Sequence, residues 1–110
     1  MNKALRLTNS ASFNYIYRNG TALSSPILVL FYVKAAGLKF GVSVSKKVGG
    51  SVARNKAKRR IREAIRKILP RLGGNYNYVI SAREGIADAS FDDILGALLS
   101  LFEKAGHLKA

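Results

Sequence analysis

The stretch that decides the fold runs from Ser45 to Pro70 and reads SKKVGGSVARNKAKRRIREAIRKILP. Successive helical residues are about 100° apart around the axis, and on that spacing one side of residues 51–69 is apolar. The apolar side consists of Ala57, Ile61, Ala64, Ile65 and Ile68. Ser51 is placed to cap the start of this helix, and Pro70 stops it. A helix with one apolar side packs that side against another element, so the stretch predicts a layered domain.

The other sides of this helix are densely basic. Eleven of the 19 Lys and Arg residues lie between Lys46 and Arg71, where Glu63 is the only acid. The whole chain has a formal net charge of +13, although residues 72–110 are slightly acidic. Like charges packed on one helix repel one another, which argues against a merely solvated face. The pattern indicates a phosphate-rich partner bound with strong salt dependence, and a membrane surface is the competing anion.

A short helix is expected before this segment, over residues 9–19. Phe13, Ile16 and Tyr17 have the spacing of one helix face, and Gly20 follows as a terminator.

Three segments have the composition of strands. Residues 27–33 form a nearly continuous apolar run, residues 39–45 alternate polar and apolar side chains, and residues 76–82 are again rich in apolar and aromatic side chains. Only a short turn at Ala36 and Gly37 separates the first two segments, so we expect them to pair as a hairpin.

The last segment predicts an amphipathic helix. Its apolar positions recur at helical spacing and are Phe91, Ile94, Leu95, Leu98, Leu99 and Phe102. Asp88, Asp92 and Asp93 suit the positive N-terminal end of that helix, which accounts for them more simply than Mg²⁺ ligation does.

The elements follow one another as helix, strand, strand, helix, strand and helix. We therefore expect a single domain over residues 1–110 with an α/β fold, an α+β sandwich whose small sheet of three to four strands is covered by helices. The basic helix then joins two strands as a crossover, a connection that is right-handed as a general rule.

The sequence argues against several other kinds of site. The chain has no cysteine, which excludes disulfides and thiolate metal sites. Its one histidine, His107, has no evident partner and is interpreted as incidental, and no cluster of histidines and carboxylates suggests a stand-alone nuclease. Gly49 and Gly50 lack the spacing of a nucleotide-binding loop and are interpreted as a hinge. Without a run of ~20 apolar residues or a signal peptide, we expect a cytoplasmic protein.

From Ser45 to Glu63 the chain resembles the bacterial ribonuclease P protein subunit. That family has a Ser-Lys-Lys loop, then an Arg-Asn-Arg signature that opens a basic helix continuing Lys-Arg-x-x-Arg-Glu, and these elements occur here in order. Lys56 stands at the second Arg of the signature, and lysine keeps the charge but lacks the planar guanidinium fork. The segments 5–7 and 39–45 also resemble the family, so the resemblance covers nearly the whole chain.

The resemblance implies an accessory subunit without catalytic residues of its own, because in that family an RNA subunit removes the 5′ leader from precursor tRNA. It also implies a left-handed crossover and Mg²⁺ held by the RNA, and we expect no obligate protein partner. The catalytic RNA is expected to contact the basic helix at Arg54, Asn55, Lys56, Lys58, Arg59, Arg62 and Arg66. The leader of precursor tRNA is expected to contact Phe13, Tyr17, Phe31, Ser45, Lys46 and Lys47.

The aromatic residues have two interpretations. From spacing alone Phe13, Tyr17 and Phe31 belong in a core, whereas exposed aromatic rings stack unpaired bases for about 1–3 kcal/mol each. The remaining strand and helix tyrosines, Tyr15, Tyr32, Tyr76 and Tyr78, are not assigned to either face. A structural rRNA-binding protein is the alternative class. It would share the basic helix but would not need an aromatic cleft.

Overall fold

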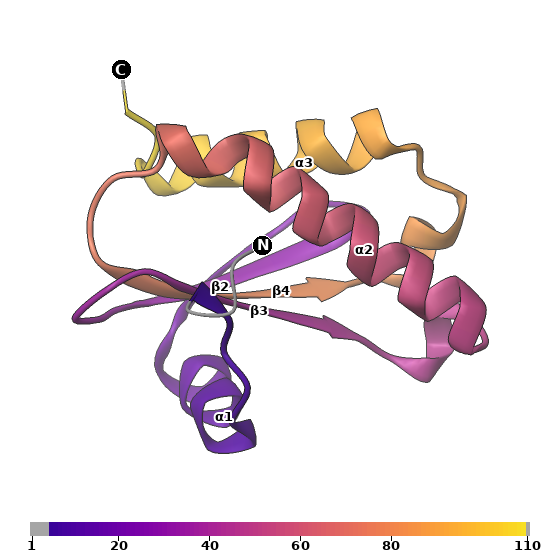
Figure 1. Ribbon diagram of the computed structural model, residues 1–110, viewed down its shortest axis with the longest axis horizontal. Coiled ribbons are helices and arrows are strands. Elements are labelled where there is room, and N and C mark those ends of the chain that lie inside the picture. Colours follow the sequence, from indigo (N-terminus) through magenta and orange to yellow (C-terminus); the bar gives the residue numbers. More distant parts are fainter. Residues whose placement is uncertain (1–4, 110) are drawn as a thin grey trace.

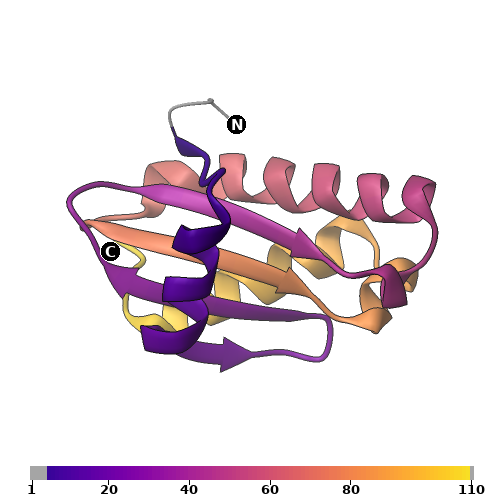
Figure 2. The ribbon, with the colours of Figure 1, turned by 90° about the horizontal axis from the view of Figure 1, so that it is seen from below.

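A four-stranded mixed sheet forms the middle layer of the protein, with one helix on one face and two helices on the other (Figure 1). The computed structural model describes residues 5–109. The elements in chain order are α1 (Ser10–Asn19), β1 (Thr21–Ser24), β2 (Leu28–Lys34), β3 (Lys39–Val44), α2 (Ser51–Ile68), β4 (Tyr76–Ala82) and α3 (Phe91–Ala105). Short 3₁₀ turns at Lys46–Val48, Leu69–Arg71 and Glu84–Asp88 join them. Helices α2 and α3 cover one face, and α1 crosses the other (Figure 2).

The strand order is β1-β2-β4-β3, so the last strand in the chain lies between β2 and β3. Strand β4 is antiparallel to β2, with Leu30 opposite Ile80, and parallel to β3, with Val42 opposite Ile80. The expected hairpin between residues 27–33 and 39–45 is therefore wrong. The buried run Tyr78, Val79 and Ile80 makes β4 the most buried strand, as expected at the centre of a sheet that is covered on both faces.

The hairpin that does form joins β1 to β2, with Thr21 opposite Tyr32 and Ser24 opposite Val29. The sequence predicted a sheet of three to four strands, and β1 is the fourth. Its side chains are mostly exposed, which explains why no apolar pattern marks it. It begins at Thr21 opposite Tyr32, so Val33 and Lys34 of β2 extend past the edge strand.

The core lies between the sheet and the helices α2 and α3. The predicted apolar side of α2 is confirmed, because all five of its members are buried. They meet Leu28, Leu30, Phe40, Tyr78 and Ile80 of the sheet and Ile94, Leu98 and Phe102 of α3. Phe40 stacks on Tyr78 with ring centroids 5.3 Å apart. Each fully buried large apolar side chain contributes about 1.5–3 kcal/mol, so this layer holds α2 on the sheet. No helix within residues 5–109 is long and apolar enough to cross a membrane.

Two helix starts differ in how they are capped. Ser51 is the first residue of α2 and not its cap: Gly50 takes the cap position, without a side-chain hydrogen bond. Gly49 has φ of 151°, a conformation that lets the chain turn sharply into the helix. Helix α3 begins with a capping box in which Ser90 and Asp93 exchange hydrogen bonds of 3.0 Å, which confirms the helix-end role expected of Asp93.

The chain end folds back on the sheet. Gly106, with φ of 77°, ends α3, and His107 is then buried with only 9% of its surface exposed. Its Nδ1 lies 2.7 Å from the Tyr78 hydroxyl, and its ring stacks on Tyr76 at 3.9 Å. The expectation that His107 is incidental is therefore wrong. Its partners are distant in sequence, on β4, and no local pattern reveals them.

Candidate RNA interface

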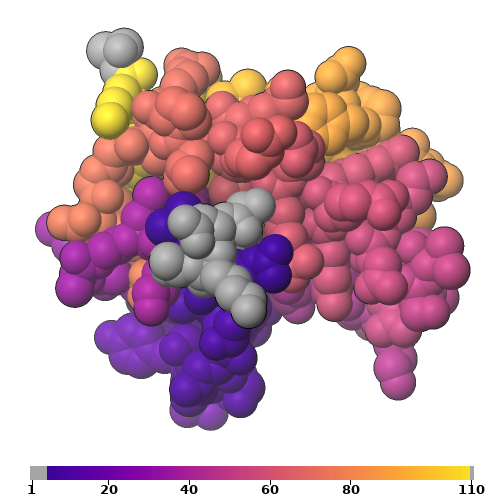
Figure 3. Space-filling view, viewed as in Figure 1, coloured from indigo at the N-terminus to yellow at the C-terminus, as the bar shows by residue number. Residues whose placement is uncertain are grey.

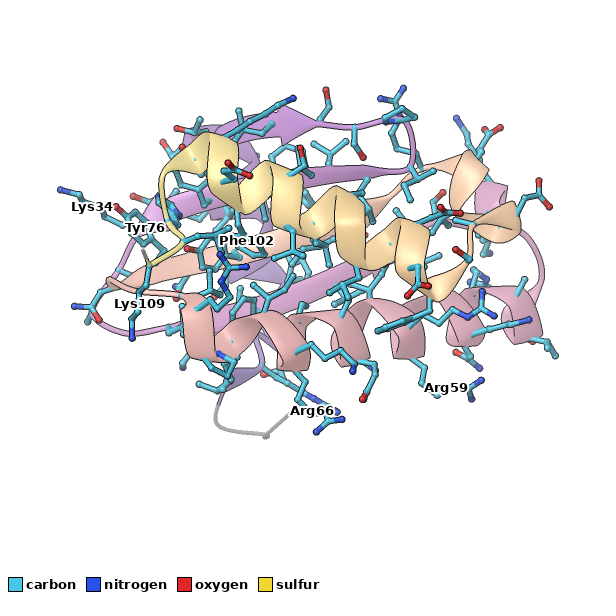
Figure 4. All side chains as sticks on the ribbon, turned by 90° about the horizontal axis from the view of Figure 1, so that it is seen from above. Lys34, Arg59, Arg66, Tyr76, Phe102 and Lys109 are labelled. Carbon is cyan, nitrogen blue, oxygen red and sulfur yellow. The ribbon has the colours of Figure 1, made fainter. Side chains whose placement is uncertain are left out.

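The basic residues of α2 divide between two sides of the helix. Asn55, Lys58, Arg59 and Arg62 line one hollow of about 390 Å³, which we call the cationic hollow; Arg6 and Glu63 complete it. Lys56 instead lines a separate hollow with Arg60 and Ile86. The helix thus brings together most of the residues expected to contact the catalytic RNA but places Lys56 on its other side. Figure 4 shows Arg59 and Arg66 projecting from α2 away from the sheet and α3.

Arg6 is a member of the cationic hollow that the sequence interpretation missed. It forms an isolated parallel bridge with Phe40, and the Leu7 amide donates to the Phe40 carbonyl at 2.8 Å. This bridge brings the N-terminal segment alongside β3, within reach of α2. The basic residue between Leu5 and Leu7 was the available signal, but only the fold shows that it reaches α2.

Three arginines lack an acceptor at Nε: Arg6 and Arg62, which line the cationic hollow, and Arg54 in the first turn of α2. The Nε atoms of Arg6, Arg54 and Arg62 are shielded from solvent, yet none has a hydrogen-bond partner among the residues that the structure describes. Burial, and secondly the charge of Arg6, lower the pKa of Arg62. Two guanidinium groups close enough to repel one another, each with an unsatisfied N–H, form a site that a phosphate oxygen would stabilise.

Two other arginines of α2 already have acceptors. Arg60 donates to the Ala89 carbonyl at 3.0 Å, which ties α2 to the segment before α3. Arg66 pairs with Glu63, and this pair raises the pKa of Arg66 and lowers the pKa of the Glu63 carboxyl. Both partners are well exposed, so the pair adds little to stability. Arg66 is nevertheless less free to meet an RNA phosphate than Arg59 is.

An aromatic groove lies on the opposite face of the sheet, beside α1. It has a volume of about 420 Å³, and its lining includes Phe13, Asn14 and Tyr17 of α1, Ser43 and Val44 of β3, and Lys58 of α2. The surface is hollowed between α1, which projects from the body of the protein, and the segment that begins α2 (Figure 3).

The three aromatic residues expected at the leader lie together but not equivalently. Tyr17 is 38% exposed; its ring meets Phe31 edge-on at 4.9 Å and lies 6.5 Å from the ring of Phe13. The Tyr17 hydroxyl is 3.2 Å from Ser81 Oγ. Phe31 is partly buried and does not line the groove, so it supports Tyr17 from behind. Tyr17 and Phe13 are the rings presented to a ligand.

The three remaining residues expected at the leader, Ser45, Lys46 and Lys47, follow directly after β3 and are exposed. Ser45 and Lys47 line a neighbouring hollow with Arg83 and Glu84 rather than the aromatic groove. Arg83 is a second cation that the sequence interpretation missed, because it lies far along the chain at the end of β4. It donates to the Ser25 carbonyl at 3.2 Å.

Lys58 is the residue that joins the two main sites. It lines both the cationic hollow and the aromatic groove, and its side chain is partly buried between them. The two sites are therefore adjacent, with Lys58 at their common boundary. Within residues 5–109, no three His, Asp or Glu side chains come together in a way that would hold a metal ion.

A cationic hollow and an aromatic groove, sharing one lysine on a small α+β domain, define a class of protein. It is a basic binding protein suited to a polyanionic, partly unpaired ligand. The chain belongs to the ribonuclease P family, since the family model for ribonuclease P matches residues 1–106.

Its relatives are protein components of that endoribonuclease. The ribonuclease P protein component of Symbiobacterium thermophilum is 36% identical over 112 residues, which cover 99% of this chain and 97% of the relative. That of Clostridium botulinum is 40% identical over 107 residues, which cover 94% and 96%. The solved structure of the Staphylococcus aureus RNase P protein matches with a TM-score of 0.87 at 28% identity, covering 97% of this chain and all of that one. The resemblance and the fold class inferred from the sequence are confirmed.

Proposed function

We propose that this ribonuclease P protein component works by holding two RNAs at once. The cationic hollow and the cations on the same side of α2 bind the catalytic RNA subunit, and the aromatic groove binds the unpaired 5′ leader of precursor tRNA. The RNA subunit then cleaves the leader, and the protein alone is inactive. The observation that carries the proposal is the position of Lys58, which lines both sites and places them side by side.

The chemistry of each site fits its proposed ligand. The unpaired Nε–H groups of Arg6, Arg54 and Arg62 are donors suited to backbone phosphates, which occur in every RNA irrespective of sequence. Tyr17 and Phe13 offer ring faces, and base stacking tolerates any base, as a leader that varies from one tRNA to another requires. Asn55, which lines the cationic hollow, adds an amide able to contact a 2′-hydroxyl or a base edge.

The net charge explains why such a protein assists an RNA enzyme. Two RNAs repel one another through their phosphates, and a chain of formal charge +13 placed between them reduces that repulsion. In this proposal Mg²⁺ is bound by RNA phosphates, and the protein lowers the concentration of Mg²⁺ that the reaction needs. The complex works in the cytoplasm, where precursor tRNA is made, and requires no obligate protein partner.

The proposal is tested by cleavage of precursor tRNA with a bacterial catalytic RNA at low Mg²⁺, with and without the protein. We expect the wild-type chain to stimulate cleavage by the catalytic RNA strongly, and the protein alone to cleave no precursor tRNA. Arg59→Ala should reduce stimulation, whereas Lys104→Ala, a loss of the same charge on α3, should not. No stimulation at any Mg²⁺ concentration would refute the proposal.

The leader assignment needs a separate substrate comparison. Tyr17→Ala should weaken the affinity for a substrate with a leader by about tenfold, from the loss of one stacked base, and should leave a leaderless substrate unaffected. Equal weakening for both substrates would show that the aromatic groove does not bind the leader.

A further inference from the structure

A third hollow lies at the corner where α1 leads into β1. We call it the tyrosine hollow, and the members used here are Tyr15, Asn19, Tyr32, Lys34, Tyr76 and His107. Its volume is about 520 Å³, within the range of roughly 300–1,000 Å³ typical of ligand pockets. It shares no lining residue with the aromatic groove. Tyr15 is two residues from both Phe13 and Tyr17, about 200° around the helix, so it faces away from that groove.

The walls of the tyrosine hollow are aromatic and fixed in place. The ring of His107 stacks on Tyr76 at 3.9 Å and meets Tyr32 edge-on at 4.6 Å, and Tyr32 meets Tyr76 edge-on at 5.9 Å. The hydrogen bond from Tyr78 to His107 anchors the cluster from below. These rings are therefore held in position before any ligand arrives, which reduces the entropy lost on binding.

The rim of the hollow has one free ring. Tyr15 is 59% exposed, one of the three most exposed large apolar side chains that the structure describes. Within residues 5–109 its ring packs against no other aromatic ring, unlike the rings of Tyr32 and Tyr76. Its backbone is fixed, because the Asn19 amide donates to the Tyr15 carbonyl at 3.0 Å. An exposed ring above a rigid aromatic wall is the arrangement that stacks a flat ligand.

The charge around the hollow favours an anionic ligand. Lys34 is exposed and lines it, and none of its lining residues in the described chain is acidic. Figure 4 shows Lys34, Tyr76 and Lys109 gathered at one end of the molecule, opposite the end where Arg59 lies. A flat aromatic group carrying a phosphate is the ligand chemistry that matches both the rings and the cation.

We propose that the tyrosine hollow binds an unpaired nucleotide of RNA, with Tyr15 stacking on the base and Lys34 contacting the phosphate. This site is distinct from the aromatic groove, and it does not depend on what the groove binds. A chain with two separate stacking sites on either side of α1 holds unpaired RNA at two points.

The test is titration of the full chain, without other RNA, with a uridine pentanucleotide at about 0.15 M salt, where long-range charge effects are largely screened. The ring signals of Tyr15, Tyr76 and His107, followed by NMR, should shift with the nucleotide. Tyr15→Ala should weaken binding read from His107 about tenfold and leave binding read from Phe13 unchanged. Tyr17→Ala is the matched control: it should weaken the binding read from Phe13 and leave the binding read from His107 unchanged.

Two further probes separate stacking from charge. An abasic strand with the same number of phosphates should leave the ring signals of the hollow nearly unmoved, and a pentaglutamate peptide should do the same. If either probe shifts them as far as the pentanucleotide does, the site is a general anion surface or a protein-docking site and the proposal is wrong. It is equally wrong if the pentanucleotide shifts the groove signals alone. Lys34→Gln, an exposed change, repeats the test should Tyr15→Ala reduce folding.

Discussion

The hydroxyl of Tyr78 lies 2.7 Å from Nδ1 of His107, and this contact joins the central strand of the sheet to the end of the chain. Burial, and secondly the neighbouring tyrosines, raise the pKa of Tyr78, so its phenol keeps its proton. Burial lowers the pKa of His107, so the imidazole stays neutral. A neutral histidine accepts on one nitrogen and donates from the other, which makes this pair a satisfied buried hydrogen bond.

Stability should therefore fall as the solution is acidified. In the unfolded chain His107 titrates near its ordinary pKa of about 6.5, whereas in the folded chain its pKa is lower. Below about pH 6.5 the unfolded state binds more protons than the folded state, so stability decreases until the pH reaches the folded pKa. Carboxyl groups titrate mostly below this window. Urea unfolding from pH 7 to pH 5 measures the slope, which His107→Phe should reduce.

Tyr78→Phe provides the control for this prediction. It retains the histidine and its buried position, so the slope between pH 7 and pH 5 should persist. The free energy of unfolding should nevertheless fall by about 1–3 kcal/mol at pH 7, because Nδ1 of His107 loses its partner. A flat pH profile in the wild-type chain would contradict both expectations.

Gly41 sets the distance between α1 and the sheet. A Cβ atom at this position would overlap the ring of Phe13, so Gly41→Ala should push α1 outward. We expect a loss of stability of about 1–3 kcal/mol, typical of overpacking, together with weaker binding of leader-containing substrate. Gly37→Ala is the matched control, because a Cβ atom there meets nothing within 4 Å. Phe13→Leu combined with Gly41→Ala should recover part of the lost stability; no recovery would mean that the overlap is not the cause.

Arg59 and Arg60 are neighbours in sequence that should respond differently to substitution. Arg59 is exposed in the cationic hollow, so Arg59→Ala should weaken binding to the catalytic RNA and reduce its salt slope by about one unit, with little change in stability. Arg60 donates to the Ala89 carbonyl, so Arg60→Ala should lower stability by about 0.5–1.5 kcal/mol. Thermal unfolding and salt-dependent filter binding measure the two effects. Equal changes in both variants would contradict the division of α2 into two sides.

The sequence predicted elements well and pairings poorly, for a physical reason. A period of two residues identifies a strand and its buried face, but it does not state which strand lies next to it. The insertion of β4 between β2 and β3 depends on where α2 carries the chain, and only tertiary packing decides that. The spacing of α2 did predict all five of its buried residues, because the helical period alone assigns a face.

The sequence-based prediction of the candidate site was limited in the same way, because it found only residues that lie close together in the chain. The charged residues of α2 are local and were found, whereas Arg6, Arg83 and His107 reach their sites through contacts distant in sequence. The family signature also groups Lys56 with Lys58, although the structure separates them.

Lys56→Arg restores the residue usual in the signature, yet it should change little. Lys56 lines the hollow on the far side of α2, beside Arg60 and away from Arg6. We expect affinity for the catalytic RNA within about twofold of wild type, a difference of about 0.4 kcal/mol or less. A gain of tenfold would mean that the RNA also contacts that side of the helix.

Lys58→Ala should weaken both RNA interactions, because this side chain lines the cationic hollow and the aromatic groove together. Affinity for the catalytic RNA, measured without substrate, should fall with the loss of one phosphate contact. Affinity of the assembled enzyme for precursor tRNA should fall further with a leader than without one. Arg59 lines the cationic hollow but not the aromatic groove, so Arg59→Ala is the control. It should weaken assembly and leave the leader dependence unchanged. If Lys58→Ala changes assembly but not leader dependence, the two sites act separately and the shared role of Lys58 is wrong.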